Sequence, residues 1–284
     1  MMKSDAPALS EAKLTAPTIS EDGVLKVGVN TSQSPLAGMG NSKIIGIDVD
    51  IAAAMADSLG LKLTIVDTGS TPEKSIANGE VDVAFGIDKS DAPSGVKLTD
   101  SYIPTAVVYF KKAGTTPTAL TGDASPRIGA QGSSKSAWSA TNAFGTDAVT
   151  ASADLAGAFQ SLESGQVEYV VADAVIGMYA ANKAGVSVEV AALGTDASGY
   201  CVAIAEKNTA LVSDITTALA KLVDDGTVAA IERKWLGGEV DLSVAQKISK
   251  TASNSTNSSN TGSKSSEGFS ESGTTATDAN SVTG

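Results

Sequence analysis

The sequence predicts an α/β protein built from two lobes, each a β-sheet covered by helices. Apolar residues recur at a helical spacing from Ile51 to Leu59, and a β-branched run, Leu61 to Val66, follows at once. A helix that leads directly into a strand is typical of a layered α/β sheet. From Arg127 the alternation of strand and helix begins again, which predicts a second, smaller lobe of the same kind.

The helices and strands of the first lobe are predicted in part from the residues expected at their ends. Asp48 or Asp50 is expected to accept hydrogen bonds from the free N–H groups at the start of the central helix, and Gly60 to form its left-handed cap. A shorter helix is predicted over 71–79, with proline near its first turn and glycine at its end. Strands are expected over 25–30, 61–66, 81–86 and 102–111.

The second lobe and the return of the chain are predicted in the same way. Strands are expected over 127–130 and 167–172, and helices over 131–138, 154–165 and 174–184. After these come a strand over 200–205 and helices over 209–223 and 227–236. The single cysteine, Cys201, lies in an alternating run, so a buried structural thiol is favoured over a reactive one.

Composition excludes several function classes. The chain has 20 basic and 32 acidic residues and a net charge of -12, which argues against nucleic acid or an anionic membrane surface as the main partner. It contains no histidine, so a Ser-His-Asp or Cys-His catalytic system and a histidine metal site are excluded. Residues 1–21 lack the apolar core of a signal peptide, and no window is long and apolar enough to span a membrane.

A resemblance becomes specific at Gly46-Ile47-Asp48-Val49-Asp50 and the helix that ends in Leu59-Gly60, with Leu25 to Asn30 upstream. This stretch resembles the opening of the bacterial extracytoplasmic solute-binding proteins of family 3, the polar amino-acid-binding proteins of ABC importers. Ile47 stands where members typically carry an aromatic residue. The resemblance covers roughly residues 24–238, and its other well-matched pieces are 128–134, 165–174 and 206–237.

The resemblance implies a two-lobe, type II periplasmic-binding-protein-like fold in which the chain crosses between lobes twice and so forms a hinge. The expected organisation is a flexible leader (1–22), a first lobe (23–112 and 196–241), a second lobe (113–195) and a disordered tail (242–284). The tail is rich in Ser, Thr, Asn and Gly and cannot bury enough apolar surface to order itself. A flexible spacer or glycosylated stalk is the alternative interpretation.

The resemblance also implies the function. It predicts an extracytoplasmic solute-binding subunit of an ABC importer that captures a small polar solute, an amino acid or a derivative, by closure of its lobes. No enzyme activity, cofactor or metal is implied, and the expected partners are the solute and a membrane permease, with the protein itself a monomer. The expected location is the periplasm, or the cell surface as a lipoprotein, with the signal or anchor absent from this chain. The alternative is a surface receptor or sensor on the same fold, with an altered or lost amino-acid site.

The family's ligand positions fall on ten residues of this chain. In the first lobe they are Asn30, Gln33, Leu36, Gly86, Ile87 and Lys89, and in the second lobe Gln131, Ser133, Ser134 and Asp173. Members carry Thr-x-x-Arg, whose guanidinium clamps the ligand carboxylate, where this chain has Asp91-Ala92-Pro93-Ser94. The two arginines, Arg127 and Arg233, are expected away from the cleft, so the binding of an ordinary α-amino acid remains open.

Several of these residues have a structural alternative. Lys89 supplies a point charge to the ligand or is a solvated loop lysine. Residues 131–134 form an anion site at a helix N-terminus or an ordinary serine cap, and Asp173 accepts the ligand amino group or caps the following helix. Asp48 and Asp50 are expected to start a helix rather than bind a metal. Trp138 and Tyr200 stack on a ligand or lie in the core.

Overall fold

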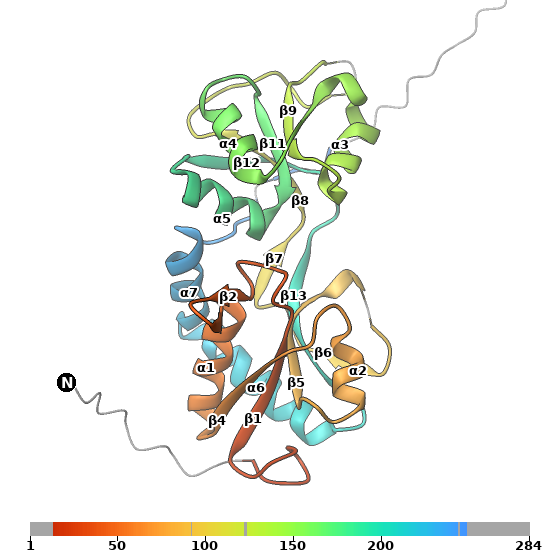
Figure 1. Ribbon diagram of the computed structural model, residues 1–284, viewed down its shortest axis with the longest axis vertical. Coiled ribbons are helices and arrows are strands. Elements are labelled where there is room, and N and C mark those ends of the chain that lie inside the picture. Colours follow the sequence, from red (N-terminus) through yellow and green to blue (C-terminus); the bar gives the residue numbers. More distant parts are fainter. Residues whose placement is uncertain (1–13, 92, 122–123, 244, 249–284) are drawn as a thin grey trace, which may run out of the picture. The chain divides into compact units, whose positions relative to one another are not determined.

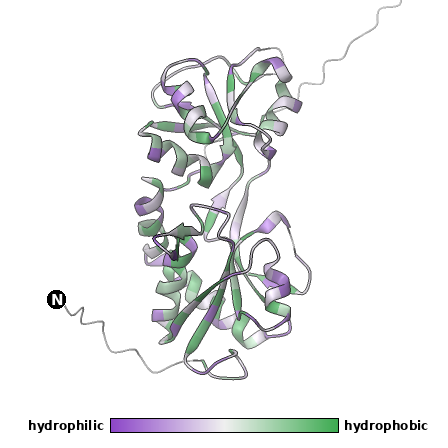
Figure 2. Ribbon diagram, viewed as in Figure 1, coloured by the Kyte–Doolittle hydropathy of each residue, from purple (hydrophilic) through white to green (hydrophobic). Residues whose placement is uncertain are grey.

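The computed structural model describes residues 14–248 except 92, 122–123 and 244. Within this part of the chain, two mixed β-sheets carry helices against their faces, as Figure 1 shows, and the predicted two-lobe α/β class is confirmed. The strands of both sheets are hydrophobic along much of their length, whereas the helices carry hydrophilic residues on part of their surface (Figure 2).

The first sheet has the strand order β4-β1-β5-β13-β6, with β7 also paired to β13. β1 runs parallel to β4 and β5, whereas β13 is antiparallel to its neighbours. The strands are β1 (Val24–Val29), β4 (Lys62–Asp67), β5 (Val83–Asp88), β6 (Val96–Leu98), β7 (Ile103–Thr105) and β13 (Ser198–Ala205). A separate hairpin joins β2 (Gly38–Gly40) to β3 (Lys43–Ile45).

The helices of the first lobe are α1 (Ile47–Leu59), α2 (Pro72–Ala77), α6 (Thr209–Asp224) and α7 (Thr227–Leu236), with a 3-10 turn η1 (Lys89–Asp91). Successive residues of β5 pack on opposite faces of the sheet because side chains alternate along a strand. Val83 and Phe85 join the large core that includes α1 and α6, whereas Ala84 joins Ile76 of α2 in a second cluster.

The second sheet has the order β10-β9-β11-β8-β12, with β10 and β11 parallel to β9, and β8 antiparallel to β11 and β12. Its strands are β8 (Val107–Lys112), β9 (Ile128–Gln131), β10 (Val149–Ser152), β11 (Tyr169–Asp173) and β12 (Val188–Leu193). Its helices are α3 (Lys135–Phe144), α4 (Leu155–Glu163) and α5 (Ala174–Ala184), with a 3-10 turn η2 (Thr146–Ala148).

The chain crosses between the sheets at Ala106 and again over 194–197. The sequence predicts one β-rich run over 102–111, but β7 pairs in the first sheet and β8 in the second. The lobe boundary expected after residue 112 therefore moves to Ala106. The residues on both sides of the crossing have the sequence pattern of a β-strand, so the pattern does not show where the chain changes sheets.

Residues beyond α7 return to the second sheet. The Val240 N–H donates to Glu232 at 3.1 Å, and Val240 and Leu242 are buried. Further on, the Leu193 N–H donates to the Gln246 carbonyl and the Ile248 N–H to the Leu193 carbonyl, both at 3.0 Å. The expected disordered tail begins at 242, yet these residues pair with the edge of β12; the rest of that tail lies outside the described residues, as does most of the expected leader.

The start of α1 differs from the prediction. Its N-cap is Gly46 and no side chain caps it, so neither Asp48 nor Asp50 has the expected capping role. Asp50 instead accepts from the Lys234 ammonium and the Trp235 indole N–H, both at 2.7 Å, which fastens α1 to α7. The other end is as expected, because Gly60 adopts the left-handed conformation.

Two further expectations concern Cys201 and the membrane. Cys201 is fully buried in β13, as the alternating pattern predicts, and burial raises the pKa of its thiol. Among the helices of the described residues, none has both the length and the hydropathy of a membrane crossing.

Candidate functional site

A cavity of about 850 Å3, called the main cavity here, lies where parallel strands of both sheets end. Its lining comes from the ends of β5 and β11, the two crossing segments and the start of α3. Small ligands favour such positions, at strand carboxyl ends and between domains. The lining residues are Gln33, Gly86, Asp88, Lys89, Ser90, Asp91, Thr105, Ala106, Val107, Gln131, Ser134, Lys135, Ser136, Leu155, Val171, Ala172, Asp173, Ile176, Thr195, Asp196, Ala197, Ser198 and Tyr200.

Five lining residues that are not exposed are joined by hydrogen bonds into two groups, in which Ser198 contacts Asp88, and Thr105 and Tyr200 contact Asp173. We call these five residues the floor: Asp88, Thr105, Asp173, Ser198 and Tyr200. Asp173 is the last residue of β11 and the N-cap of α5. Its Oδ1 accepts from the N–H groups of Val175 and Ile176, each at 3.0 Å. Its Oδ2 accepts from the Thr105 hydroxyl at 2.5 Å and lies 3.4 Å from the Tyr200 hydroxyl. The carboxylate is therefore fixed by four protein donors.

Asp88 is the second floor carboxylate and ends β5 in the first sheet. Its Oδ1 accepts from the N–H and the hydroxyl of Ser90 at 2.9 and 2.8 Å, and from the Ser198 hydroxyl at 2.5 Å. No hydrogen bond to its Oδ2 is made within the described part of the chain. Asp88 therefore has one oriented carboxylate oxygen that receives no hydrogen bond from the described residues.

Burial raises the pKa of two floor residues, Asp173 and Tyr200. Burial raises the pKa of Asp173, although hydrogen bonds from Ile176 N–H and Thr105 act in the opposite direction. Burial also raises the pKa of Tyr200, helped by the negative charges of Asp173 and Asp88, so this phenol stays protonated. Tyr200 is 6% exposed, and it can donate a hydrogen bond within the cavity.

A buried hydrogen-bonded pair, Asp48 and Tyr102, lies behind the cavity wall at Gly86. The Tyr102 hydroxyl donates to Asp48 Oδ1 at 2.6 Å and accepts from the Gly86 N–H at 2.9 Å. Asp48 is 1% exposed, and burial raises its pKa from 3.8 to about 7. Gly86 has a φ of +76°, and a Cβ at this position would lie 2.6 Å from Asp48 Oδ2. Only glycine therefore fits this part of the wall without displacement.

A side cavity of about 220 Å3 shares Gln33, Gly86 and Asp91 with the main cavity. It lies at the carboxyl ends of β1 and β4 and beside the start of α2. Its remaining lining residues are Asn30, Thr68, Gly69, Ser70, Pro72, Glu73, Phe85, Ile87 and Pro93.

Eight of the ten residues expected at the ligand line one of the two cavities. Gln33, Gly86, Lys89, Gln131, Ser134 and Asp173 line the main cavity, and Asn30 and Ile87 line the side cavity. The other two line neither. Leu36 is 1% exposed and belongs to the hydrophobic core, and Ser133 is exposed beside the start of α3.

Ser134 and Asp173, for which a helix cap was the alternative to a ligand-binding role, are both helix caps in the structure. Ser134 is the N-cap of α3, and its Oγ accepts from the Ala137 N–H at 3.0 Å. Asp173 caps α5 while it also faces the main cavity. Of the two aromatic residues, Tyr200 lies on the floor, whereas Trp138 is 72% exposed on α3.

Sequence reasoning missed Thr105, Asp88 and Ser198. Asp88 and Thr105 each end a strand, and a polar residue at the end of a strand was a usable signal. The crossing itself was not located, because 102–111 was predicted as one run. Ser198 contacts Asp88 across 110 positions in the sequence, which no local pattern reveals.

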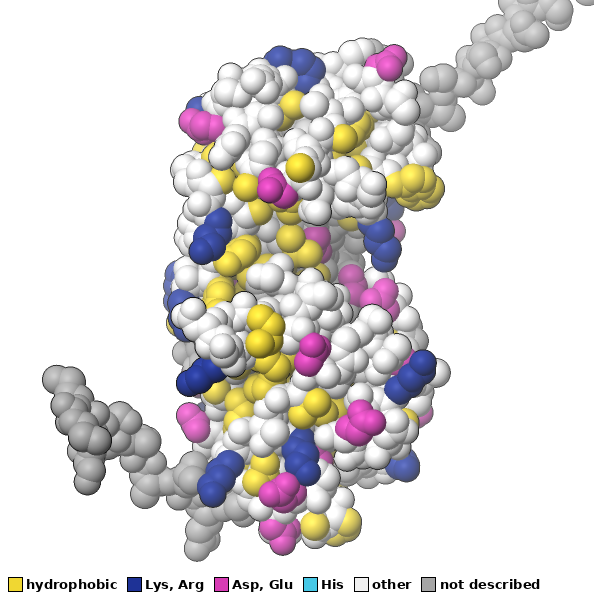
Figure 3. All heavy atoms as spheres, viewed as in Figure 1, with side chains coloured by type: hydrophobic (Ala, Val, Ile, Leu, Met, Phe, Trp, Pro, Cys, Tyr) yellow, Lys and Arg dark blue, Asp and Glu magenta, His cyan; other side chains and the backbone are white. Residues whose placement is uncertain are grey.

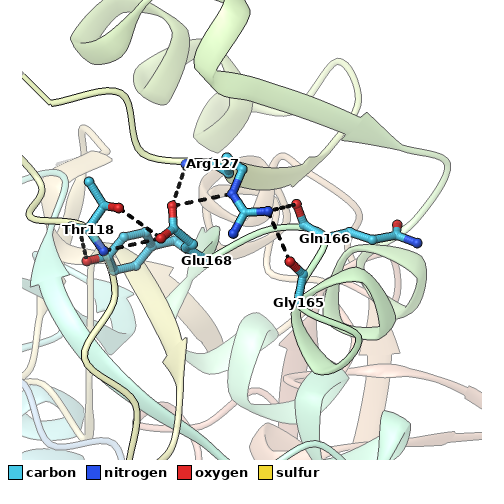
Figure 4. A network of polar contacts seen from close by, with 6 residues as sticks. Thr118, Arg127, Gly165, Gln166 and Glu168 are labelled. Atoms are coloured by element: carbon cyan, nitrogen blue, oxygen red, sulfur yellow. Dashed lines mark hydrogen bonds and ion pairs between the residues drawn. The ribbon is translucent and has the colours of Figure 1, made fainter.

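Both arginines lie outside the two cavities. As Figure 4 shows, the Arg127 guanidinium donates to the carbonyls of Gly165 and Gln166 at 3.1 Å and lies 3.6 Å from Glu168, which also accepts from Thr118. Arg233 pairs with Glu239. No guanidinium group lines either cavity.

Other kinds of site are not supported by the described residues. They contain no group of three or more side chains arranged to hold a metal ion. Figure 3 shows lysine, arginine and acidic side chains interspersed over the face in view.

The model of the bacterial extracellular solute-binding proteins, family 3, matches residues 25–238. The L-cystine-binding protein TcyJ of Escherichia coli (strain K12) is 24% identical over 229 residues, which are 78% of this chain and 86% of that protein. TcyA, the L-cystine-binding protein of Bacillus subtilis (strain 168), is 24% identical over 231 residues, 78% of this chain and 85% of that protein.

Solved structures agree in fold. A polar amino acid ABC uptake transporter substrate-binding protein from Streptococcus thermophilus is similar with a TM-score of 0.66 and 21% identity, over 77% of this chain and 88% of that one. The L-cystine solute receptor of Neisseria gonorrhoeae, in its unliganded open conformation, gives a TM-score of 0.64 and 18% identity over 77% and 94% of the two chains. The expected type II periplasmic-binding-protein-like fold is thereby confirmed.

Proposed function

The chain belongs to family 3 of the bacterial extracellular solute-binding proteins, and we propose that it captures an amino acid or amino-acid derivative in the main cavity for an ABC importer. The observation that carries this proposal is the lining of that cavity. It combines polar residues from the ends of strands in both sheets with residues of both crossing segments. A solute held there touches both lobes at once.

Closure of the lobes follows from this arrangement. Asp88 belongs to the first sheet and Asp173 to the second, and the crossings near Ala106 and Ala197 lie between them. A ligand that contacts both lobes stabilises the closed form by the contacts it makes only there. We expect an open form without solute and a closed form with it.

The ligand class rests on the relatives as well as on the cavity. Two relatives carry the name L-cystine-binding protein, and a similar structure is a polar amino acid transporter subunit. Partners beyond the solute follow from the family: a membrane permease receives the solute, and the protein acts as a monomer. We place it in the periplasm or at the cell surface as a lipid-anchored protein.

The first experiment is a thermal-shift panel with the twenty amino acids and L-cystine. A ligand at about a hundred times its dissociation constant adds roughly 2.7 kcal/mol to the free energy of unfolding, which such an assay resolves. A shift from at least one amino acid supports the proposal. If none of these compounds shifts the melting temperature, the proposal of amino-acid capture is wrong, and a surface receptor or sensor on the same fold becomes the favoured interpretation.

A matched pair of variants tests the site itself. Asp173 and Asp154 are both helix N-caps of the second lobe, but only Asp173 lines the cavity; Asp154 caps α4 through the Gly157 N–H at 2.8 Å. Asparagine caps a helix about as well as aspartate, so both variants should fold. We expect Asp173→Asn to weaken binding at least tenfold and Asp154→Asn to leave it unchanged. Equal affinities of the two variants for the solute would contradict a binding site at Asp173.

A further inference from the structure

The charged residues that line the main cavity differ in their exposure to solvent. Of its six charged lining residues, Lys89, Asp91, Lys135 and Asp196 are exposed at the rim. The two that are not exposed, Asp88 and Asp173, are both carboxylates. A group that enters the cavity to its floor therefore meets only negative formal charge.

The floor suits a cation and disfavours an anion. Asp88 Oδ1 accepts from three protein donors, which orients the carboxylate, and no donor among the described residues reaches Oδ2. Asp173, in the opposite lobe, is held by the Val175 and Ile176 N–H groups of its own lobe and by the Thr105 hydroxyl of the first lobe. A ligand ammonium can donate a hydrogen bond to Asp88 Oδ2 and is attracted by the negative charge of both carboxylates, whereas a ligand carboxylate placed there is repelled by both.

The floor offers a ligand carboxylate no fixed cation. Arg127 and Arg233 are engaged with Glu168 and Glu239 away from both cavities. The lysines of the lining, Lys89 and Lys135, are exposed, and an exposed lysine contributes little to the binding of a carboxylate because solvent screens the pair. The carboxylate of an amino acid is thus left at the rim.

We propose that the main cavity recognises its solute by a cationic nitrogen group held between Asp88 and Asp173, and that a free carboxylate on the solute is dispensable. The class of ligand is a small organic ammonium: an amino acid bound by its amino group, its carboxyl amide, or the corresponding amine. This inference rests on the proposed function for the location of the site, and it goes beyond it in the group that is recognised. Because the two carboxylates belong to different lobes, the cation also offsets their mutual repulsion when the lobes close.

The test compares probes that differ only at the carboxyl group. L-arginine, L-argininamide and agmatine, and L-lysine, L-lysinamide and cadaverine, are titrated into the full chain by calorimetry, together with each amino acid that scores in the thermal-shift panel and its amide. Amides and amines that bind as tightly as the parent amino acid, or less than tenfold more weakly, support the inference. A loss of tenfold or more on amidation of every amino acid that binds overturns it while leaving amino-acid capture intact.

Two other outcomes are decisive. Binding of amines without binding of any amino acid supports the inference and overturns the amino-acid part of the proposed function. Silence from all probes overturns both.

A variant of the floor and a variant outside both cavities give an independent readout. Asp88→Asn keeps an oxygen for the Ser90 and Ser198 donors, so the fold should persist, as circular dichroism can verify. We expect Asp88→Asn to weaken binding of the tightest amide or amine at least tenfold, and Asp154→Asn, which caps α4 and lines neither cavity, less than threefold. Unchanged or tighter binding to Asp88→Asn would overturn the role of the floor carboxylates.

Discussion

The buried carboxyl of Asp48 makes the stability of the protein depend on pH in a direction opposite to that of most aspartates. Its folded-state pKa is raised from 3.8 to about 7 by burial, so between these values the folded protein holds a proton that the unfolded chain has released. The free energy of unfolding therefore falls as pH rises through this window, and the loss is complete above the folded pKa. Asp48→Asn is neutral at every pH and removes this contribution.

The magnitude follows from the shift. One pKa unit corresponds to about 1.4 kcal/mol, so the contribution of Asp48 changes by about 2–3 kcal/mol between about pH 5 and about pH 8. Asparagine can still accept the Tyr102 hydroxyl through its Oδ1. We expect the stability of Asp48→Asn relative to the native protein to rise by that amount over this range. Glu232, whose pKa burial also raises to about 7, is present in both proteins and cancels in the difference.

The assay is urea denaturation across this pH range. The control is Asp57→Asn, because Asp57 lies exposed on the same helix. The control should give a difference from the native protein that is flat within about 0.5 kcal/mol. Parallel pH profiles for Asp48→Asn and the native protein would refute the assignment of a protonated Asp48.

Two further predictions concern the cavity wall and the C-terminal return. Gly86 and Gly79 both have positive φ, but only at Gly86 would a Cβ meet Asp48, so Gly86→Ala should destabilise by about 1–3 kcal/mol more than Gly79→Ala in denaturation, and should also weaken solute binding. Equal losses would show that backbone conformation alone is responsible. Ending the chain after residue 238 removes the buried Leu242 and its neighbours, and should cost about 3 kcal/mol of unfolding free energy. A truncated chain as stable as the full one would contradict the packing seen for this segment.

Sequence patterns located the main elements because they depend on local chemistry. The apolar spacing from Ile51 to Leu59 identified α1, and Gly60 marked its end, since few other residues adopt the left-handed conformation there. Asp173 was placed correctly at the end of a strand and the start of a helix, which put it at the cavity.

The remaining features depend on contacts between distant residues. Asp48 has the pattern of a helix-start aspartate, yet its partner is Tyr102, 54 positions away. Nothing near Thr105 indicates that its hydroxyl meets Asp173, because that contact exists only after the chain changes sheets at Ala106. Local patterns therefore identified Asp173 but not its partner Thr105, and they identified neither residue of the pair formed by Asp88 and Ser198.

The position of β13 in the first sheet has a consequence for how the protein acquires its structure. This strand lies between β5 and β6, although it comes last in sequence among the strands of the described residues. Until residues 198–205 have been synthesised, the hydrogen-bonding edge of β5 has no neighbour on that side, and the N-terminal lobe cannot be completed. The whole intervening lobe must be made first, so the folding reaction is dominated by contacts of long sequence separation and is expected to be slow. A nascent chain that stops short of β13 carries an open, hydrophobic strand edge, which is a template for aggregation.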